Sequence, residues 1–306
     1  MRIKVLGAAA GGGFPQWNCG CPNCREVRAG ILGAKPQTQE CVGISADGER
    51  WFLLNASPEI RSQVESYPPL HPRGPRDSPI AAVVLTNGDL DHSLGLLSLR
   101  ESHPLVIYAT DRVRQGFIEG NVLYRTLQRF PGQVTWKTLT LGQAVSLNGV
   151  DGRPSGLFVE AVPVPGKPPV HLEGLVPSDP GENVGLLIHD RGTGKRLAYF
   201  SAAGGITAAV RKALDGADCM FFDGTFWSDD ELIALGLGAK HAAEMAHLPV
   251  GGTGGSLDLL TGIRASRRIY IHINNTNPLL RPRSPERAQA EASGWEIACD
   301  GMEVAL

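Results

Sequence analysis

The stretch that decides the fold is Thr86-Asn87-Gly88-Asp89-Leu90-Asp91-His92, directly after the apolar run at residues 80–85. A short apolar run that ends in turn-forming residues is typical of a buried β-strand. If the alternation of the strand continues, Asn87, Asp89 and Asp91 point the same way and His92 begins the next element. Carboxylates and an imidazole gathered at a strand end suit a divalent metal. Asn and Asp are also favoured in turns and helix N-caps, so this segment by itself leaves both interpretations open.

Two distant segments favour the metal. Asp223 ends the apolar run Phe221-Phe222, and His272 ends the run Ile269-Tyr270-Ile271. Metal sites are assembled from separate strand ends of this kind. His247 closes a predicted helix before a Gly-rich turn, where it could be a ligand, a proton carrier or a helix-end cation.

A second donor set lies in the loop at residues 17–25, which contains Cys19, Cys21 and Cys24 in the pattern C-x-C-x-x-C. Cysteines this close together do not easily form disulfides, whereas three thiolates can wrap one Zn²⁺ ion with a fourth ligand from elsewhere. The alternatives are metal-free thiols and a redox pair, and the redox pair lacks the thioredoxin-like setting it needs. We therefore expect structural zinc. Cys41, Cys219 and Cys299 stand apart, and we expect each to be a small buried residue.

The composition is that of an ordinary globular chain, with 306 residues, 42% hydrophobic and 20% charged, and a formal net charge of −2. Bulk charge therefore attracts neither nucleic acid nor an anionic membrane. No apolar run approaches the roughly 20 residues of a membrane span. The first 13 residues are typical of a strand and turn rather than of a signal peptide, so a cytoplasmic location is the expectation.

The remaining pattern predicts more strands than helices, with polar residues at strand ends, which indicates α/β or α+β layers with a site along one rim. Strands are predicted at residues 3–6, 51–54, 80–85, 105–108, 157–162, 184–189, 196–200, 220–222 and 269–273. Helices are predicted at residues 93–101, 111–129, 208–214, 229–235, 240–247 and 256–264. The Pro-rich segment 163–180 is interpreted as an active-site loop rather than a linker, so residues 1–306 are expected to form a single domain.

Several blocks resemble the pyrroloquinoline quinone (PQQ) biosynthesis protein B family of the metallo-β-lactamase superfamily. They are Gly11-Gly12-Gly13-Phe14-Pro15-Gln16-Trp17-Asn18-Cys19, Thr86 to Leu97, Phe222-Asp223-Gly224-Thr225, Met245 to Pro249 and Ile271-His272-Ile273-Asn274-Asn275-Thr276-Asn277-Pro278. The resemblance covers almost the whole chain. It implies the metallo-β-lactamase fold, a four-layered αββα sandwich with metals at the sheet ends.

The chain departs from the hydrolases of that superfamily in an informative way. They carry H-x-H-x-D-H, whereas here Asn87 and Asp89 occupy the first two histidine places. The segment around Ala202 also lacks the usual bridging Asp. The resemblance therefore implies a single active-site metal on Asp91, His92 and His272, a mixed set that fits Fe²⁺ with open positions. Asp223, His247 and Asp89 are the candidate catalytic residues.

The family resemblance implies iron-dependent hydroxylation of the tyrosine ring in a cross-linked Glu–Tyr precursor, with the quinone precursor and O₂ as substrates. A non-catalytic carrier that assists transport or release of PQQ or its precursor, and a metal-dependent hydrolase, are the alternatives. Other PQQ biosynthesis proteins and a second copy in a homodimer are the expected partners. In related phosphodiesterases a His completes the cysteine zinc site; Asn275 stands at the matching place here, so the fourth ligand stays open.

Overall fold

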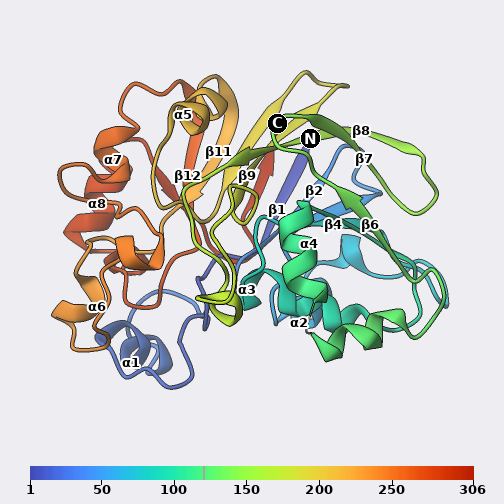
Figure 1. Cartoon of the computed structure of the whole chain (residues 1–306). Helices are drawn as coiled ribbons and strands as arrows, with labels where there is room; N and C mark the ends of the chain where they lie inside the picture. Colours follow the sequence, from blue (N-terminus) through green and yellow to red (C-terminus); the bar gives the residue numbers. More distant parts are fainter. Residues whose placement is uncertain (120) are drawn as a thin grey trace.

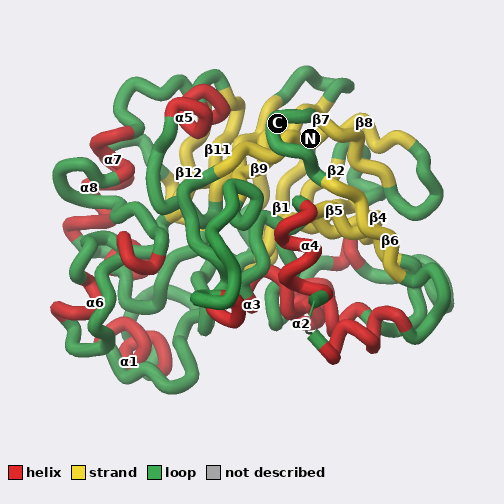
Figure 2. Tube along the Cα trace, in the orientation of Figure 1, coloured by secondary structure: helices red, strands yellow, loops and turns green. Residues whose placement is uncertain are grey.

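Two seven-stranded β-sheets lie face to face in the computed structural model, which describes residues 1–119 and 121–306 (Figures 1 and 2). The first sheet has the order β14 (Glu303–Ala305), β1 (Arg2–Gly7), β2 (Cys41–Ser45), β3 (Trp51–Leu54), β4 (Ile80–Val84), β5 (Leu105–Ala109) and β6 (Val134–Thr138). The second has the order β13 (Glu296–Ile297), β12 (Ala265–Ile271), β11 (Ala217–Asp223), β10 (Arg196–Phe200), β9 (Val184–Asp190), β8 (Pro154–Pro163) and β7 (Ala144–Asn148).

Helices cover the outer face of each sheet. They are α1 (Pro22–Arg28), α2 (Ile60–Glu65), α3 (Leu90–Ser93), α4 (Asp111–Ile118), α5 (Ala208–Leu214), α6 (Glu231–Ala234), α7 (Ser256–Leu259) and α8 (Pro285–Ala292). Short 3₁₀ turns are η1 (Pro68–Leu70), η2 (Leu94–Leu99), η3 (Val122–Gln128), η4 (Val170–Leu172), η5 (Ala243–Met245) and η6 (Pro278–Leu280). Figure 1 places α5, α7 and α8 on one side of the strands and α2 and α4 on the other.

Three hydrophobic cores separate these layers. One lies between the sheets and contains side chains from β1 to β5 and from β8 to β12. A second lies between the second sheet and the helices that include α1, α5 and α8, and a third lies between the first sheet and α2 and α4. Three cores between successive layers make an αββα sandwich, which confirms the predicted fold class.

The central strands explain the continuous apolar runs in the sequence. In β4, Ala82 and Val84 face the core between the sheets, while Val83 faces the helices. In β11, Phe221 faces the inner core and Phe222 the helical side. Because side chains alternate along a strand and both faces are covered here, every position must be apolar.

The sheet topology brings the predicted site segments to one edge. Strands β3, β4, β5 and β6 run parallel in the first sheet, as do β10, β11, β12 and β13 in the second. Isolated bridges from Ala9 to Ile273 and from Asn87 to Asn183 join the two sheets beyond the ends of β12 and β4. The carboxyl ends of β4, β11 and β12 therefore meet.

Some predicted elements are wrong in extent or type. The helix predicted at 240–247 is a single 3₁₀ turn, η5, and the one predicted at 111–129 ends at Ile118, before η3 begins at Val122. Residues 236–241 are exposed and Ala242 is the one buried residue within 240–247, so this segment lacks the tertiary packing that stabilises a longer helix. Strands β2, β6, β7, β13 and β14 and helices α1, α2 and α8 were not predicted.

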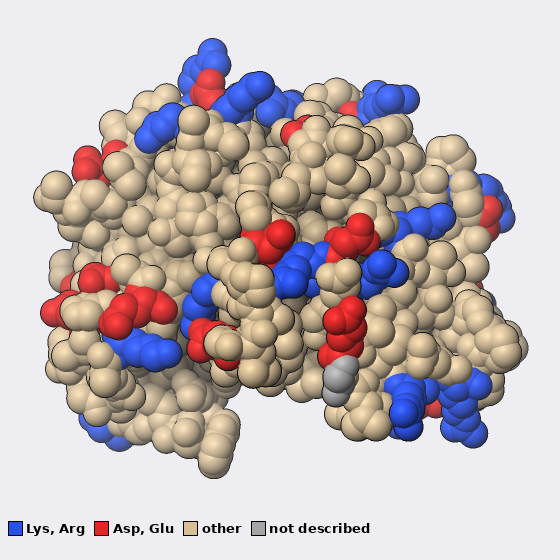
Figure 3. All heavy atoms as spheres, viewed as in Figure 1, with Lys and Arg blue, Asp and Glu red and all other residues tan. Residues whose placement is uncertain are grey.

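The surface carries charges of both signs. On the face in Figure 3, Lys and Arg alternate with Asp and Glu along a band across the middle. Among the residues that the structure describes, no helix is long and apolar enough to cross a membrane. Cys41 and Cys219 are buried as expected, but Cys299 is exposed, so that expectation was wrong.

Candidate metal centre

Asp91 and His92 reach the site from a helix rather than from a strand. Strand β4 ends at Val84, and Asp89 forms the N-cap of the short helix α3, whose first turn carries Asp91 and His92. The expected strand alternation through Asn87, Asp89 and Asp91 is therefore wrong. Asp89 stands at the N-cap position, as the turn-and-cap interpretation expects, and the helix that begins there carries both candidate ligands to the sheet edge. The two interpretations of this segment are therefore compatible.

Asp91, His92 and His272 converge from the two sheets. Oδ2 of Asp91 lies 3.1 Å from Nε2 of His272 and 3.7 Å from Nε2 of His92. Donor atoms that share one ion at about 2.0–2.2 Å lie about 3–3.6 Å apart, so these two distances are close to those around a common metal. All three ligand atoms lie within 4.8 Å of one another. His272 follows β12 with a φ of 59°, a left-handed conformation that turns the chain at this point.

The protonation of these groups favours metal binding. Burial lowers the pKa of His92 to about 4, so its ring is neutral at neutral pH. Burial opposes ionisation of Asp91, but the attraction of His92 and His272 outweighs it and holds its pKa well below the usual range. Nε2 of His92 is buried without a hydrogen-bond partner in the described part of the chain. A buried ring nitrogen without a hydrogen-bond partner needs an explanation, and its free lone pair suits a metal ligand.

Thr225 holds His272 in the orientation that a ligand needs. Nδ1 of His272 lies 2.8 Å from the Thr225 hydroxyl oxygen, and that hydroxyl donates to Oδ1 of Asp223 at 2.6 Å. Since the hydroxyl has one proton and gives it to the carboxylate, His272 donates from Nδ1 and keeps the lone pair of Nε2 for a metal. The sequence reasoning missed Thr225, although it lies two residues after Asp223.

Asp223 and His247 form a hydrogen-bonded pair beside His272. Nδ1 of His247 lies 2.7 Å from Oδ2 of Asp223, and the His247 ring stacks on that of His272 with centroids 5.4 Å apart. Burial opposes both charges, but the mutual attraction lowers the pKa of Asp223 and raises that of His247.

Asp223 also accepts from the backbone N–H groups of Ala203 and Thr225, in addition to the Thr225 hydroxyl. With His247 this makes four donors on one carboxylate, which fills its usual acceptor positions. The arrangement therefore suits Asp223 to orienting His247 rather than to binding a metal.

Asp89 lies at the mouth of the same cluster. Its side chain is half-buried, and burial together with the charge of Asp91 raises its pKa to about 6, although His247 and Lys167 lie close enough to lower it. A carboxyl with that pKa exchanges its proton near neutral pH.

Amide groups fill the place where hydrolases of this fold would hold a second metal. Nδ2 of Asn87 donates to Oδ1 of Asn183 at 3.4 Å, and Nδ2 of Asn183 donates to the carbonyl oxygen of Ala202 at 3.1 Å. Uncharged amides bonded to each other and to the backbone are poor replacements for His and Asp ligands. Asn183 was not identified from the sequence.

The three cysteines of the N-terminal loop converge as predicted. Cys21 caps α1, and its sulfur lies with those of Cys19 and Cys24 within one cluster of potential ligands. The side-chain nitrogen of Asn275 lies 3.1, 3.7 and 3.3 Å from the sulfurs of Cys19, Cys21 and Cys24. Asn275 thus stands at the fourth corner of the cluster. Its Nδ2 and Oδ1 can exchange places by a flip of the amide.

Two loops close over the metal cluster. Gly11 packs so tightly against Asp91 that a Cβ at this position would lie 3.3 Å from Oδ2 of Asp91. Pro169, in the segment 163–180, packs in the same way on Gly88. The segment interpreted as an active-site loop therefore lies next to the site.

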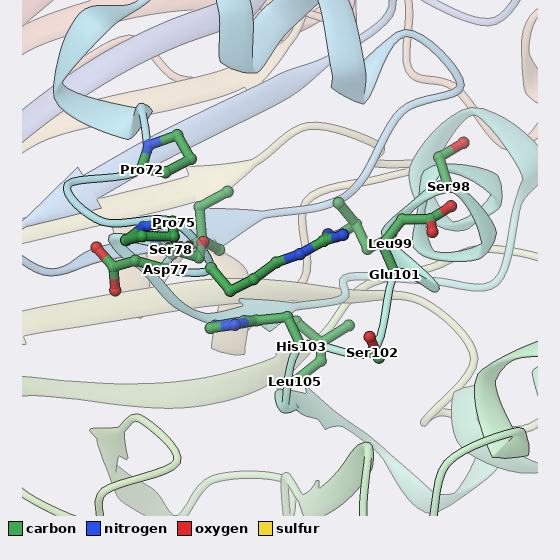
Figure 4. A pocket seen from close by; sticks show the side chains of 12 residues that line it. Pro72, Pro75, Asp77, Ser78, Ser98, Leu99, Glu101, Ser102, His103 and Leu105 are labelled. Atoms are coloured by element: carbon green, nitrogen blue, oxygen red, sulfur yellow. Dashed lines mark hydrogen bonds between the residues drawn. The ribbon is translucent and has the colours of Figure 1, made fainter.

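A hollow at the opposite edge of the first sheet is separate from this centre. It is a cavity of about 350 Å³ lined by residues that include Asp77, Ser78, His103 and Leu105 (Figure 4). Since Ile80 and Leu105 begin β4 and β5, this cavity lies at the amino ends of strands whose carboxyl ends carry the metal cluster.

Known proteins resemble the chain throughout. Residues 50–273 match the family described as the beta-lactamase superfamily domain. Coenzyme PQQ synthesis protein B of Azotobacter vinelandii is 44% identical over the full length of both chains. The protein of the same name from Rhizobium meliloti is 47% identical and covers all of this chain and 98% of its own. The crystal structure of Zn²⁺-bound PqqB from Methylobacterium extorquens superimposes with a TM-score of 0.92 at 42% identity, with both chains fully covered.

Proposed function

Because the chain belongs to the coenzyme PQQ synthesis protein B family within the β-lactamase superfamily, we propose that it serves PQQ synthesis as an Fe²⁺-dependent oxygenase. Its reaction is hydroxylation of the tyrosine ring in the cross-linked Glu–Tyr precursor. The observation that carries the proposal is the donor set of one carboxylate and two imidazoles on Asp91, His92 and His272. Two His and one carboxylate with open positions are typical of non-haem iron oxygenases.

Iron bound at this site would supply the coordination positions and electrons for O₂ activation. Ring hydroxylation places one oxygen atom of O₂ in the aromatic C–H bond and reduces the other to water, so it consumes two electrons from an external reductant and two protons. Among the described residues, the amides of Asn87 and Asn183 and the carbonyl of Ala202 offer no second set of metal ligands at their place, which supports this reaction over hydrolysis at a two-metal site. Asp223, His247 and His272 also have the spacing of metal ligands, but His272 is shared with the first set and Asp223 already accepts four hydrogen bonds.

His247 is placed to move a proton. Its Nδ1–H donates to Asp223, so Nε2 is the atom that accepts or returns a proton, and the attraction of Asp223 raises the pKa of the ring despite its burial. Asp223 fixes the ring and stabilises its positive charge, as a carboxylate does for a catalytic His in other enzymes. We assign to His247 the role of accepting the proton of the substrate phenol.

Lys167 and Asp89 shape the entrance for an acidic substrate. Lys167 lies on the loop at 163–180, is partly exposed, and is close enough to Asp89 to influence its pKa. Its ammonium group pairs in the absence of substrate with Glu173, an exposed contact that is weak and readily exchanged. A substrate carboxylate can replace Glu173 on Lys167, while Asp89 exchanges a proton beside it.

The cysteine cluster is assigned a structural zinc. Cys19, Cys21 and Cys24 provide three soft ligands, and Asn275, with its oxygen turned toward the ion, is the fourth. This zinc ties the N-terminal loop to the segment 272–277 that follows β12. It therefore supports the backbone that carries His272, without a part in the reaction.

The test is oxygen uptake by protein prepared anaerobically and loaded with Fe²⁺. With the diamino-acid precursor and a reductant, we expect O₂ consumption and a product heavier by one oxygen atom. His92→Ala should lose both the strand-edge iron and the oxygen uptake. Replacing a residue that only orients a metal ligand typically lowers metal affinity or activity about 10- to 100-fold, so losing a ligand should cost at least that. Zinc content and circular dichroism of the variant must match the parent first.

Two other outcomes would replace the proposal. Tight binding of precursor or PQQ without oxygen uptake under any reduced metal would identify a carrier. Metal-dependent release of a cleaved product under anaerobic conditions would identify a hydrolase. Iron and oxygen uptake that persist in His92→Ala would show that the site is elsewhere.

A further inference from the structure

Three buried residues form a hydrogen-bonded chain behind the metal ligand His92, and the reaction does not use them directly. Glu40, Asn55, Thr86 and His92 are each no more than 1% exposed. Glu40 immediately precedes β2, Asn55 follows β3, and Thr86 lies just beyond β4. Because β2 runs antiparallel to β3, its beginning lies at the same edge as the ends of β3 and β4. Three neighbouring strands thus each bring one polar residue to the metal ligand.

Glu40 is the unusual member of this chain. Its Oε2 accepts a hydrogen bond of 2.8 Å from Nδ2 of Asn55, and its Oε1 has no partner among the described residues. The ring of His92 lies next to it, with Nε2 3.7 Å from Oε2. A fully buried carboxyl without a permanent cation destabilises the folded state unless other groups compensate it. Such a residue is expected to have a function.

The backbone of Thr86 determines which way the Asn55 amide points. Oδ1 of Asn55 accepts from the backbone N–H of Thr86 at 2.9 Å and from the Thr86 hydroxyl at 3.1 Å, while Nδ2 donates to Glu40. A flipped amide would set its NH₂ group against the N–H of Thr86, which can only donate. That contact would be lost, so the observed orientation is strongly preferred, and Glu40 anchors the amide from its other side.

Two groups face Nδ1 of His92: the Thr86 hydroxyl at 3.1 Å and Nδ2 of Asn55, which also donates to Glu40, at 3.3 Å. The Thr86 hydroxyl lies 3.1 Å from Oδ1 of Asn55 as well, and it has one proton to donate. When that proton is on Asn55, the Thr86 oxygen accepts the Nδ1–H of His92, and Nε2 keeps its lone pair. In the other tautomer Nε2–H would be a buried donor with no partner within hydrogen-bond distance in the described structure.

We propose that Glu40 is a positioning residue for the active-site metal, which acts through Asn55 and Thr86 to hold His92 as the Nδ1–H tautomer with Nε2 directed to the ion. The arrangement repeats that of His272, where Thr225 passes its proton to Asp223. Nδ1 of each metal-binding histidine thus contacts a threonine hydroxyl, and that hydroxyl donates to the side chain of a third residue. The inference rests on the metal site of the proposed function but not on the oxygenase reaction.

The first test determines the tautomer of His92 in the parent protein. In ¹⁵N-His-labelled protein with the cysteine zinc retained and the other site stripped, the nitrogen shifts of His92 should be those of the Nδ1–H tautomer, assigned by their absence in His92→Gln. An Nε2–H tautomer in the stripped protein would overturn the proposal.

The second test measures Zn²⁺ and Co²⁺ affinity of the stripped site by calorimetry. Glu40→Leu removes the acceptor for Asn55 and should weaken metal binding about 10- to 100-fold, as is typical for groups that orient a metal ligand. Glu40→Gln keeps an oxygen for Asn55 and should stay within about 3-fold of the parent, and Thr86→Val should resemble Glu40→Leu.

Val83→Ala is the matched control for simple destabilisation. Val83 is buried in β4 on the helical side and takes no part in the hydrogen-bonded chain, so this variant loses stability but should keep the metal affinity of the parent. Unchanged affinity in Glu40→Leu, or equal loss in Glu40→Gln and Glu40→Leu, would contradict the relay. If metal binds as expected but no oxygen is consumed, the proposed function fails while this inference stands.

Discussion

Glu231 gives a prediction in which the pH dependence of stability can be worked from the structure. It lies at the start of α6, and burial raises the pKa of its carboxyl to about 7 from an ordinary value of 4.5. Its two oxygens accept from the Trp227 backbone N–H and from the Thr276 hydroxyl. The contact with Thr276 ties α6 to the segment that carries Asn275.

The raised pKa means that the folded protein prefers the neutral carboxyl. Stability from Glu231 is therefore complete below about pH 4.5 and is lost as the pH rises through about 7. Because one pKa unit corresponds to about 1.4 kcal/mol, ionising Glu231 costs the folded state about 3 kcal/mol at high pH. Glu231→Gln removes this charge and keeps an oxygen for Trp227. We expect it to match the parent near pH 5 and to be more stable by about 2–3 kcal/mol at pH 8.5.

The assay is urea unfolding of zinc-loaded protein at pH 5, 7 and 8.5, followed by tryptophan fluorescence. Glu65→Gln is the matched control, because Glu65 is exposed at the end of α2 and its substitution should leave the pH dependence unchanged. Parallel stability curves for the parent and Glu231→Gln between pH 5 and 8.5 would refute the reasoning.

Three further predictions concern the cysteine cluster, Lys167 and the pair of Asp223 and His247. Cys21→Ser should lower zinc content and the free energy of unfolding while the strand-edge site still binds metal, measured by metal analysis and calorimetry; full zinc occupancy after all three cysteines are replaced would contradict the assignment. Lys167→Ala should raise KM for the acidic precursor with little change in kcat, and an effect on kcat alone would exclude substrate binding by this residue. Asp223→Asn should lower the pKa of His247, so the acidic limb of the pH–activity profile should move to lower pH. A limb that does not move would show that it does not report the titration of His247.

The sequence by itself determined the donor types and the layered fold. Apolar runs such as 80–85 and 220–222 had to be strands covered on both faces, because every position in them is hydrophobic. Polar residues directly after those runs had to lie at a sheet edge. The spacing of Cys19, Cys21 and Cys24 restricted them to one loop that can wrap a single ion. These inferences depend only on local order along the chain.

The tertiary structure decided how those donors are oriented. That Asp91 and His92 lie on a helical turn, rather than alternate along a strand, depends on the N-cap at Asp89. Four hydrogen-bond donors surround Asp223, and a hydrogen-bonded chain runs from Glu40 through Asn55 and Thr86 to His92. Both arrangements join segments that are far apart in sequence. A hydrogen bond requires a distance near 3 Å and a defined angle, and residue spacing along the chain fixes neither until the two sheets have packed.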